Sequence, residues 1–279
     1  LDCRRQRQMC IRDRNLYDFH EWLIKTKGNK ETTAARRLGR ISSLWRWASE
    51  SQAWGDVVPR YIQVEIMSPP APERKMAPTW VDIDLMIEAL KTQTGENAQA
   101  YYKAVVLMRC MGIRKTQAMR LRWKDFSLED RVCSIPGEIG KTKQERRGRH
   151  IPIAPALTKE MAKWGRRSGL IVTQNGEPLA QASLSQGVQR AWAAAKVEKE
   201  LYHGQSCHSL RRAFTSELVR AGAERFALEL LLGRTTGVGG DVYTDPRFVW
   251  DKMFAAVQLV PALGESAQSN SPLKLAVLT

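Results

Sequence analysis

The stretch from Cys207 to Pro246 constrains the fold of this 279-residue chain more than any other. Its first part repeats apolar residues at helical spacing, at Leu210, Phe214 and Leu218. A second apolar segment follows and stops at Gly233, a residue type that commonly ends a helix. A glycine-rich turn and Tyr243 come next. We therefore predict two helices, a helix stop and a turn, in this order.

The polar residues of this stretch follow the order His, Arg, Arg, Tyr. His208 and Arg211 are three residues apart and share one helix face, and we expect that this face is not part of the core. Arg234 directly follows the second helix, and Tyr243 follows the turn. Each residue alone has an ordinary explanation, as a surface pair or a half-buried tyrosine. Together they predict a cationic pocket with a nearby phenol, which is what attack on a phosphodiester requires.

The charge of the chain points to a polyanionic partner. The formal net charge is +15, with basic residues most in excess between Arg109 and Arg149. Membrane lipid is the competing polyanion, but no apolar run approaches the length of a membrane span. We therefore expect a nucleic acid, and no membrane, as the partner.

Cysteine usage favours a reducing compartment. The chain contains five cysteines, Cys3, Cys10, Cys110, Cys133 and Cys207. They show neither metal-ligand spacing nor the even framework of a disulfide-stabilised domain. We also expect no signal peptide. We therefore expect a cytoplasmic protein.

Helices and strands are also predicted upstream. Thr79 is expected to cap one helix, and a second should run from about Ala98 to Met111 and end at Gly112. Residues 125–153 alternate in the manner of strands. The strand positions are Phe126, then Val132, Cys133 and Ile135, then His150, Ile151 and Ile153. The charged turn from Pro136 to Arg149 joins the last two strands, and such turns are normally only solvated.

The stretch from Cys207 to Pro246 resembles the tyrosine recombinases, also called phage-type integrases. Their usual pattern is His-x-x-Arg, then Leu-Gly-His, then a tyrosine nine residues after that last histidine. The chain keeps His208, Arg211, Leu232, Gly233 and Tyr243 at this spacing. It has Arg234 where the family has His or Trp.

A second part of the resemblance lies upstream. Gly112-Ile113-Arg114 is similar to the Gly-Leu-Arg with which the family opens its catalytic domain, which makes Arg114 the first catalytic arginine. The acid usually found three residues later is Gln117, which can form hydrogen bonds but carries no charge. The family carries its catalytic lysine in the hairpin that follows. Lys141 matches best, and Lys143 is the reserve candidate.

The resemblance implies a mainly α fold with a small antiparallel β-sheet, divided into a helical core-binding domain and a catalytic domain. Residues 1–14 look like a translated sequencing adapter, so we give them no functional weight and expect the native amino terminus to be missing. Residues 15–67 would form the core-binding domain, truncated, with basic residues on phosphates. Residues 68–77 are rich in proline and are expected to form a linker. Residues 78–262 would form the catalytic domain, and residues 263–279 a tail.

The resemblance also implies a reaction, in which DNA is cleaved and rejoined through a 3′-phosphotyrosyl intermediate. Arg114 and Arg211 would neutralise the non-bridging oxygens of the phosphate while Tyr243 attacks it. His208 would accept the phenol proton, and Lys141 would protonate the departing 5′-oxygen. No metal or other cofactor is expected, since cationic side chains neutralise the phosphate. The partner would be double-stranded DNA, held by a homo-tetramer in the synaptic complex.

Two departures from the family pattern leave other interpretations open. Arg234 either replaces the usual hydrogen-bond donor to the phosphate or weakens the site. The main alternative is a DNA-binding relative that keeps the fold but has lost catalysis, with Gln117 and Arg234 as marks of decay. A type IB topoisomerase, which relaxes DNA as a monomer, shares much of this pocket.

Overall fold

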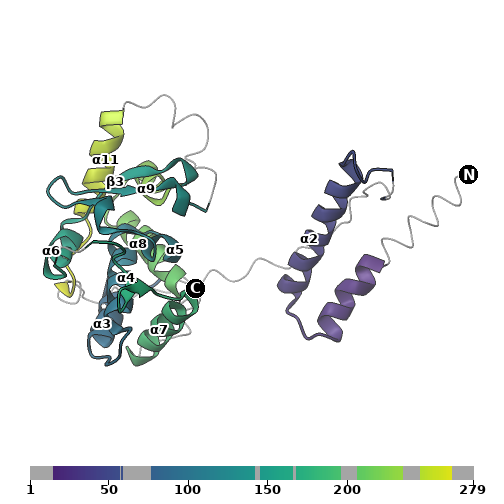
Figure 1. The fold of residues 1–279 in the computed structure, drawn as a ribbon, viewed down its shortest axis with the longest axis horizontal. Helices are drawn as coiled ribbons and strands as arrows, with labels where there is room; N and C mark the ends of the chain where they lie inside the picture. The colour runs from purple at the N-terminus through teal and green to yellow at the C-terminus, as the bar shows by residue number, and fades with distance from the viewer. Residues whose placement is uncertain are drawn as a thin grey trace, which may run out of the picture. The chain divides into compact units, whose positions relative to one another are not determined.

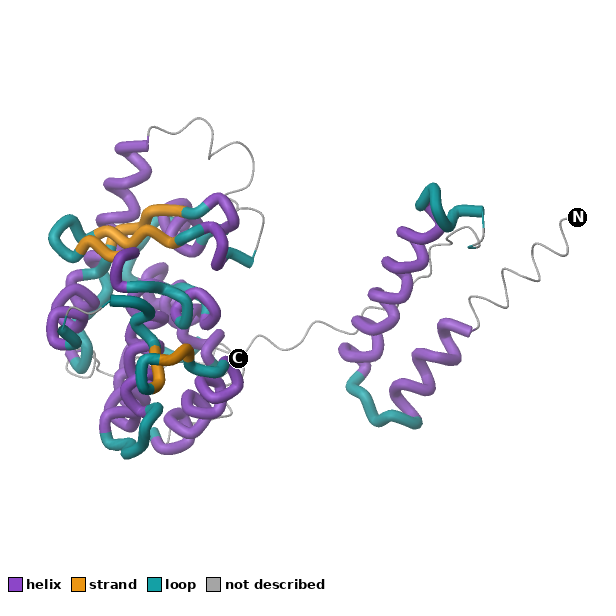
Figure 2. Tube along the Cα trace, in the orientation of Figure 1, coloured by secondary structure: helices purple, strands orange, loops and turns teal. Residues whose placement is uncertain are grey.

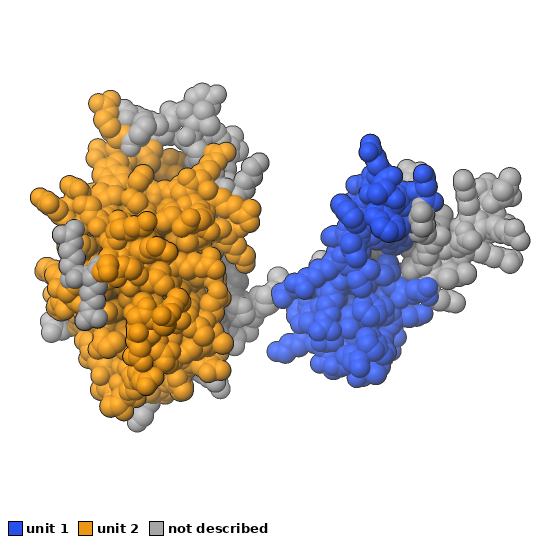
Figure 3. Space-filling model, in the orientation of Figure 1, with its two compact units in different colours: residues 1–73 blue, residues 74–279 orange. Residues whose placement is uncertain are grey.

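The computed structural model describes residues 15–56, 58, 77–141, 145–165, 168–195, 206–234 and 246–265. The chain divides into two compact units, residues 1–73 and 74–279 (Figure 3). The predicted artefact at residues 1–14, the reserve lysine Lys143 and the predicted nucleophile Tyr243 lie outside the described residues. The domain assignments given above remain predictions.

The first unit contains a helix over residues 15–25 and α2 (Glu31–Glu50). The turn between them includes Gly28, whose positive φ of 61° suits a residue without a Cβ. The buried apolar side chains of this unit are few: Leu23, Ala34 and Leu38. Leu44 and Trp47, on α2, are exposed. The described part of this unit therefore has only a small core.

The second unit is built around α4 (Ala98–Met111), which lies among the other helices in Figure 1. Every residue from Ala104 to Met111 is buried, as expected for a helix covered on all sides. Its neighbours are α3 (Trp80–Lys91), α6 (Pro155–Lys163), α7 (Gln181–Ala194) and α8 (Cys207–Arg220). The core of the unit thus sits on this central helix.

The predicted start of α3 and the predicted end of α4 are both confirmed. The Thr79 side chain accepts a hydrogen bond from the Asp82 backbone N–H, and the Asp82 carboxylate accepts one from the Thr79 backbone N–H at 2.7 Å. Helix α4 ends at Gly112, which has a φ of 60°. A Cβ at Gly112 would overlap the Phe214 ring of α8. Glycine is therefore required there by both backbone and packing, two residues before Arg114.

The predicted strands form a small antiparallel sheet. Its order is β1 (Phe126–Ser127), β2 (Val132–Ile135) and β3 (Arg149–Pro152). Figure 2 shows this sheet at one end of the helical core, and α11 (Pro246–Gln258) packs against β3. The mainly helical architecture with a small antiparallel sheet is confirmed.

Short elements connect these parts. They are α5 (Lys115–Ala118), η1 (Trp123–Asp125), η2 (Gly137–Ile139), η3 (Glu145–Arg147), the hairpin of β4 (Thr173–Gln174) and β5 (Glu177–Pro178), and α9 (Arg225–Leu232). Helix α9 contacts both α8 and α11. As predicted, α9 ends at Gly233, which has a left-handed φ of 64°.

A buried ion pair fixes the segment that follows α11. The Arg109 Nε atom lies 2.8 Å from Asp84 Oδ1, and both side chains are almost fully buried. Arg109 Nη1 donates to the Pro261 carbonyl at 3.0 Å, and the Gly264 N–H donates to Asp84 Oδ2 at 3.2 Å. The guanidinium also lies 4.8 Å from the centre of the Trp80 ring. Helices α3 and α4 are thereby joined to residues 261–264.

Candidate active site

A cavity of about 390 Å³ brings together four of the six predicted catalytic residues. It is lined by Arg114, Lys141, His208 and Arg211. Arg114 precedes α5, Lys141 lies in the hairpin between β2 and β3, and the other two belong to α8. Segments far apart in the sequence therefore meet at one cavity of cationic and histidine side chains.

The start of α8 determines where its two polar residues lie. The Ser206 side chain accepts a hydrogen bond from the His208 backbone N–H at 3.3 Å, and Ser209 Oγ accepts one from the Ser206 N–H at 3.1 Å. This cap begins the helix at Cys207. His208 is consequently in the first turn, where it is exposed.

The prediction that the shared face of α8 lies outside the core is wrong for Arg211. Its side chain is only 2% exposed, whereas His208 is exposed. The guanidinium is satisfied by backbone carbonyls, because Nη1 donates to Gly112 O at 2.8 Å and Nη2 donates to Leu232 O at 2.6 Å. These carbonyls lie two residues before Arg114 and Arg234 respectively. Arg211 therefore links the two backbone segments that carry the other arginines.

Arg234 follows the left-handed residue that ends α9. Its backbone N–H donates to Glu229 O at 2.8 Å, and its side chain is exposed. The positive charge of Arg234 contributes to lowering the pKa of Arg114, His208 and Arg211. Its guanidinium is thus electrostatically part of the same cationic cluster.

The buried arginines experience both desolvation and mutual repulsion. Burial, followed by the charges of Arg114, Arg234 and Arg149, lowers the pKa of Arg211 to about 9. The pKa of Arg114 is also lowered, first by burial and then by Arg234. An arginine with a pKa of about 9 remains protonated at pH 7. The cavity therefore keeps its positive charge and attracts an anion.

The same environment favours a neutral His208. Its pKa is lowered from the ordinary value of 6.5. Partial burial is the largest cause, followed by the charges of Arg211, Arg212, Arg114 and Arg234. At pH 7 the imidazole can therefore accept a proton.

Gln117 occupies the position where the family resemblance predicts an acid. Its side chain is fully buried, and Oε1 accepts a hydrogen bond from the Arg114 backbone N–H at 3.1 Å. Its Nε2 atom is buried without a hydrogen-bond partner among the described residues. Gln117 thus holds the Arg114 segment in place and adds no negative charge to the arginines.

Arg149, on β3, is an arginine of this cluster that the sequence analysis did not select. Its charge lowers the pKa of Arg211, and Nη2 donates to Leu231 O, in α9, at 3.3 Å. The signal was present in the sequence, because Arg149 falls on the same alternating face as Ile151 and Ile153.

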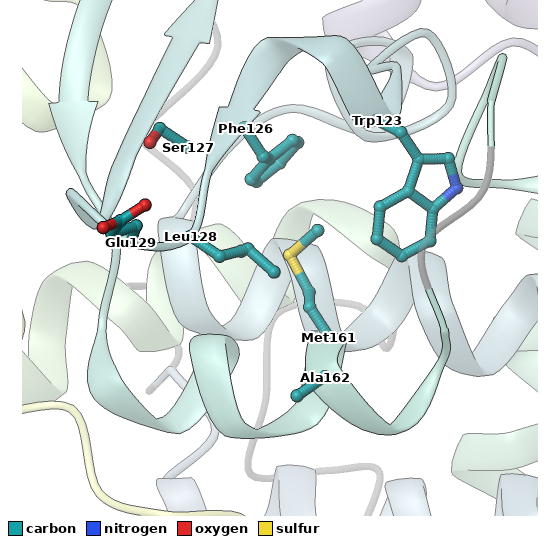
Figure 4. Close-up of a pocket in the computed structure, with 7 residues that line it drawn as sticks. All are labelled: Trp123, Phe126, Ser127, Leu128, Glu129, Met161 and Ala162. Carbon is teal, nitrogen blue, oxygen red and sulfur yellow. The ribbon is translucent and has the colours of Figure 1, made fainter.

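A larger cavity lies elsewhere and has a different character. Figure 4 shows this space of about 440 Å³ beside β1 and α6, lined by Trp123, Phe126, Leu128 and Met161. Glu129 is the charged group among its described lining residues. It contains none of the predicted catalytic residues, so a larger volume by itself does not mark the candidate site.

Within the described residues, no three His, Cys, Asp or Glu side chains are grouped so that they could hold a metal ion. None of the helices described here combines the length and the apolar character needed to cross a bilayer.

Comparison with known proteins identifies the family. The model of the phage integrase family matches residues 80–247, which is more than half of the chain. This chain belongs to the phage integrase family, the tyrosine recombinases, whose members break and rejoin DNA.

Individual relatives are distant. Tyrosine recombinase XerC of Natranaerobius thermophilus is 23% identical over 232 residues, which cover 79% of this chain and 74% of the relative. The XerC of Xanthomonas campestris pv. campestris is 23% identical over 221 residues, covering 78% of this chain and 65% of the relative. The chain thus matches about two thirds to three quarters of the length of these relatives.

A solved structure shares the fold. A lambda integrase dimer bound to a COC′ core site superposes with a TM-score of 0.61 and 16% identity, covering 80% of this chain and 79% of that chain. At this identity the similarity establishes the fold alone.

Proposed function

We propose that this chain is a site-specific recombinase that cleaves and rejoins double-stranded DNA through a 3′-phosphotyrosyl intermediate. The observation that carries the proposal is the convergence of Arg114, His208 and Arg211 on one cavity that Lys141 also lines. Four positively charged or proton-accepting groups at one place are suited to a phosphate, and family membership agrees with that substrate.

In this proposal the arginines neutralise the scissile phosphate. Arg114 and Arg211 donate hydrogen bonds to its non-bridging oxygens, and Arg234 supplies a further donor. Arg211 already donates from both terminal nitrogens to carbonyls, but each of these nitrogens carries a second hydrogen. One guanidinium can therefore fix the pocket and contact the phosphate at the same time.

Two proton transfers complete the proposed cleavage step. The Tyr243 oxygen attacks phosphorus, and neutral His208 accepts the phenol proton. The bond from phosphorus to the 5′-oxygen breaks, and Lys141 protonates that oxygen. The roles of Tyr243 and Arg234 rest on their sequence positions after Gly233. Rejoining reverses these steps, because the phosphotyrosyl bond conserves the energy of the broken bond.

We further propose that the chain acts as a homo-tetramer on two DNA duplexes, in the cytoplasm. Its formal net charge of +15 supports a polyanionic partner. The lambda integrase structure with the same fold contains a DNA core site, which supports DNA as that partner.

A covalent-trapping experiment tests the proposal. The protein is incubated with nicked duplexes tiled across the DNA that flanks its reading frame, because an integrase gene commonly lies beside its attachment site. The nick lets the cleaved end diffuse away, so wild-type protein should remain attached to DNA on a denaturing gel. Tyr243→Phe should abolish this band, and Tyr17→Phe, which changes an exposed tyrosine of the first unit, should leave it.

The departures from the family pattern at Gln117 and Arg234 define the alternative result of this experiment. DNA binding by the wild-type chain without any covalent band would favour a DNA-binding relative that has lost catalysis, consistent with Gln117 and Arg234. If Arg234 donates to the phosphate, Arg234→Ala should lower the cleavage rate by roughly 10²-fold. An unchanged rate would reject that role. Relaxation of supercoiled DNA by isolated monomers would instead indicate a topoisomerase.

A further inference from the structure

The inner face of the sheet carries an arginine where the strand pattern calls for an apolar residue. In the register of β2 and β3, Cys133 pairs with Ile151 and Ile135 pairs with Arg149. The three apolar members of these pairs are buried. Since side chains alternate between faces along a strand, Arg149 points to the same side as Ile151. An arginine directed inward needs polar partners inside the unit.

One hydrogen-bond partner of Arg149 lies at the carboxyl end of α9. Its Nη2 atom donates to Leu231 O at 3.3 Å, and the next carbonyl, Leu232 O, accepts from Arg211 at 2.6 Å. The last carbonyls of a helix have no partner within the helix, and positive charge is favourable there. Two arginines from different elements, β3 and α8, thus cap consecutive carbonyls just before Arg234.

We propose that Arg149 is a positioning residue of the active site, which with Arg211 fixes the end of α9 and thereby the location of Arg234. Arg149 also ties the hairpin that carries Lys141 to this helix end. The inference rests on the proposed function, because it assigns Arg149 a part in the same cleavage step. Arg149 itself does not contact the substrate in this proposal.

The electrostatics agree with this placement. Burial, the largest effect, and the charge of Arg114 lower the pKa of Arg149 to about 10, while Cys133 opposes them. Arg149 therefore remains protonated at pH 7. Its charge reaches Arg211 as well, whose pKa it helps to lower. The charge of Arg149 adds to the positive potential that an incoming phosphate meets.

Cleavage of the nicked duplex by saturating protein provides the first test. Arg149→Met keeps the length of the side chain and removes its charge and donors. It should slow cleavage by roughly 10- to 100-fold, as expected when a catalytic group is displaced by a small distance. Arg131→Met is the matched control, because Arg131 is a half-buried cation of the β1–β2 turn that lies over Phe254. Wild-type cleavage by Arg149→Met, or equal slowing in the control, would overturn the proposal.

A double-mutant comparison separates positioning from general loss of stability. If Arg149 acts through Arg234, then Arg149→Met should slow cleavage by only about twofold in an Arg234→Ala background, since coupled residues are not additive. If the rate reductions of the two single variants multiply in full in the double variant, Arg149 does not act through Arg234. Arg149→Lys keeps the charge and should recover part of the rate, whereas a purely apolar packing role predicts no recovery.

Hydrogen exchange tests the positioning without any cleavage. The backbone amides of residues 228–233 should exchange faster in Arg149→Met than in wild type, and those of α4 should not change. Unchanged exchange at residues 228–233 would overturn the proposal. If wild-type protein forms no covalent complex, the proposed function fails, while this measurement still decides the positioning. If Arg149→Met does not fold, the same exchange and cleavage-rate measurements are made on Arg149→Lys. Wild-type values in both measurements would then contradict the positioning role of Arg149.

Discussion

Arg109 and Arg211 are two buried arginines on adjacent helices of the same core, and they have opposite surroundings. Their exposed fractions are 0% and 2%. Arg109 is paired with Asp84 and lies over Trp80. Arg211 instead donates to two backbone carbonyls, and the charged groups that shift its pKa are Arg114, Arg234 and Arg149.

The difference separates a structural charge, at Arg109, from one with a proposed functional role, at Arg211. Burying a charge is unfavourable unless hydrogen bonds and an opposite charge compensate it. At Arg109 the fold supplies both. At Arg211 the described residues supply hydrogen bonds only, and the position where the family pattern predicts an acid is Gln117. The uncompensated charge is consistent with a site completed by an anionic ligand, and it can be tested by changing each arginine separately.

The largest expected effect is on stability at the structural pair. Arg109→Met leaves the Asp84 carboxylate buried without its cation, which should lower the free energy of unfolding by roughly 3–5 kcal/mol. Urea denaturation followed by circular dichroism measures this. Combining it with Asp84→Leu should restore part of the loss, because no charge is then left buried. A loss below about 1 kcal/mol would contradict the assignment of Arg109 as a structural charge that differs from Arg211.

The second expected effect is on cleavage at the functional arginine. Arg211→Met should lower the rate of covalent complex formation by roughly 10²- to 10³-fold, through loss of transition-state donors. Its free energy of unfolding should fall by less than half as much as in Arg109→Met. Lost hydrogen bonds to Gly112 and Leu232 are offset in part by relief of repulsion among the arginines. Equal destabilisation by the two substitutions would contradict the distinction.

A third change should make the functional site resemble the structural one. Gln117→Glu introduces a carboxylate that can still accept from the Arg114 backbone N–H, and it should raise the free energy of unfolding by about 1–2 kcal/mol at pH 7. Arginine charges should hold the pKa of this carboxyl below its unfolded value. The gain should therefore be present above about pH 4 and disappear as the pH falls through the folded pKa. Thermal unfolding at several pH values measures it, and no gain at pH 7 would argue against uncompensated charge.

The smallest expected effect is on the protonation of His208. Partial burial and, after it, the neighbouring cations disfavour its charged form, so its pKa in the free protein should lie below 6.5. Arg211→Met removes the largest of these charges and should move the midpoint upward. Nuclear magnetic resonance can follow the four histidines, with His208→Gln assigning the signal. A midpoint that does not respond to Arg211→Met would exclude electrostatic coupling between them.

Local signals in the sequence were sufficient for much of the fold. Thr79 caps its helix through the adjacent turn, Gly112 ends α4, and alternation locates β2 and β3. Each signal depends on neighbours within a few residues, so it can be recognised without the tertiary structure. The family pattern likewise selected Arg114, His208 and Arg211, which line one cavity.

Features that depend on distant contacts were not predictable. Arg211 was expected outside the core, but its carbonyl partners are 99 and 21 residues away in the sequence. Arg149 was treated as part of a solvated turn. Strand alternation indicates that it faces inward, but not that its partner is Leu231, 82 residues away in the sequence. The catalytic roles of all six selected residues remain predictions: Arg114, Lys141, His208, Arg211, Arg234 and Tyr243.

The left-handed Gly112 has a practical consequence for anyone who tries to redirect this protein to a new DNA target. Its missing methyl group leaves room for Phe214, and its carbonyl accepts from Arg211. Even alanine would disturb the aromatic packing and the guanidinium at once. Directed-evolution libraries should therefore leave position 112 unchanged and place their diversity on surfaces remote from it.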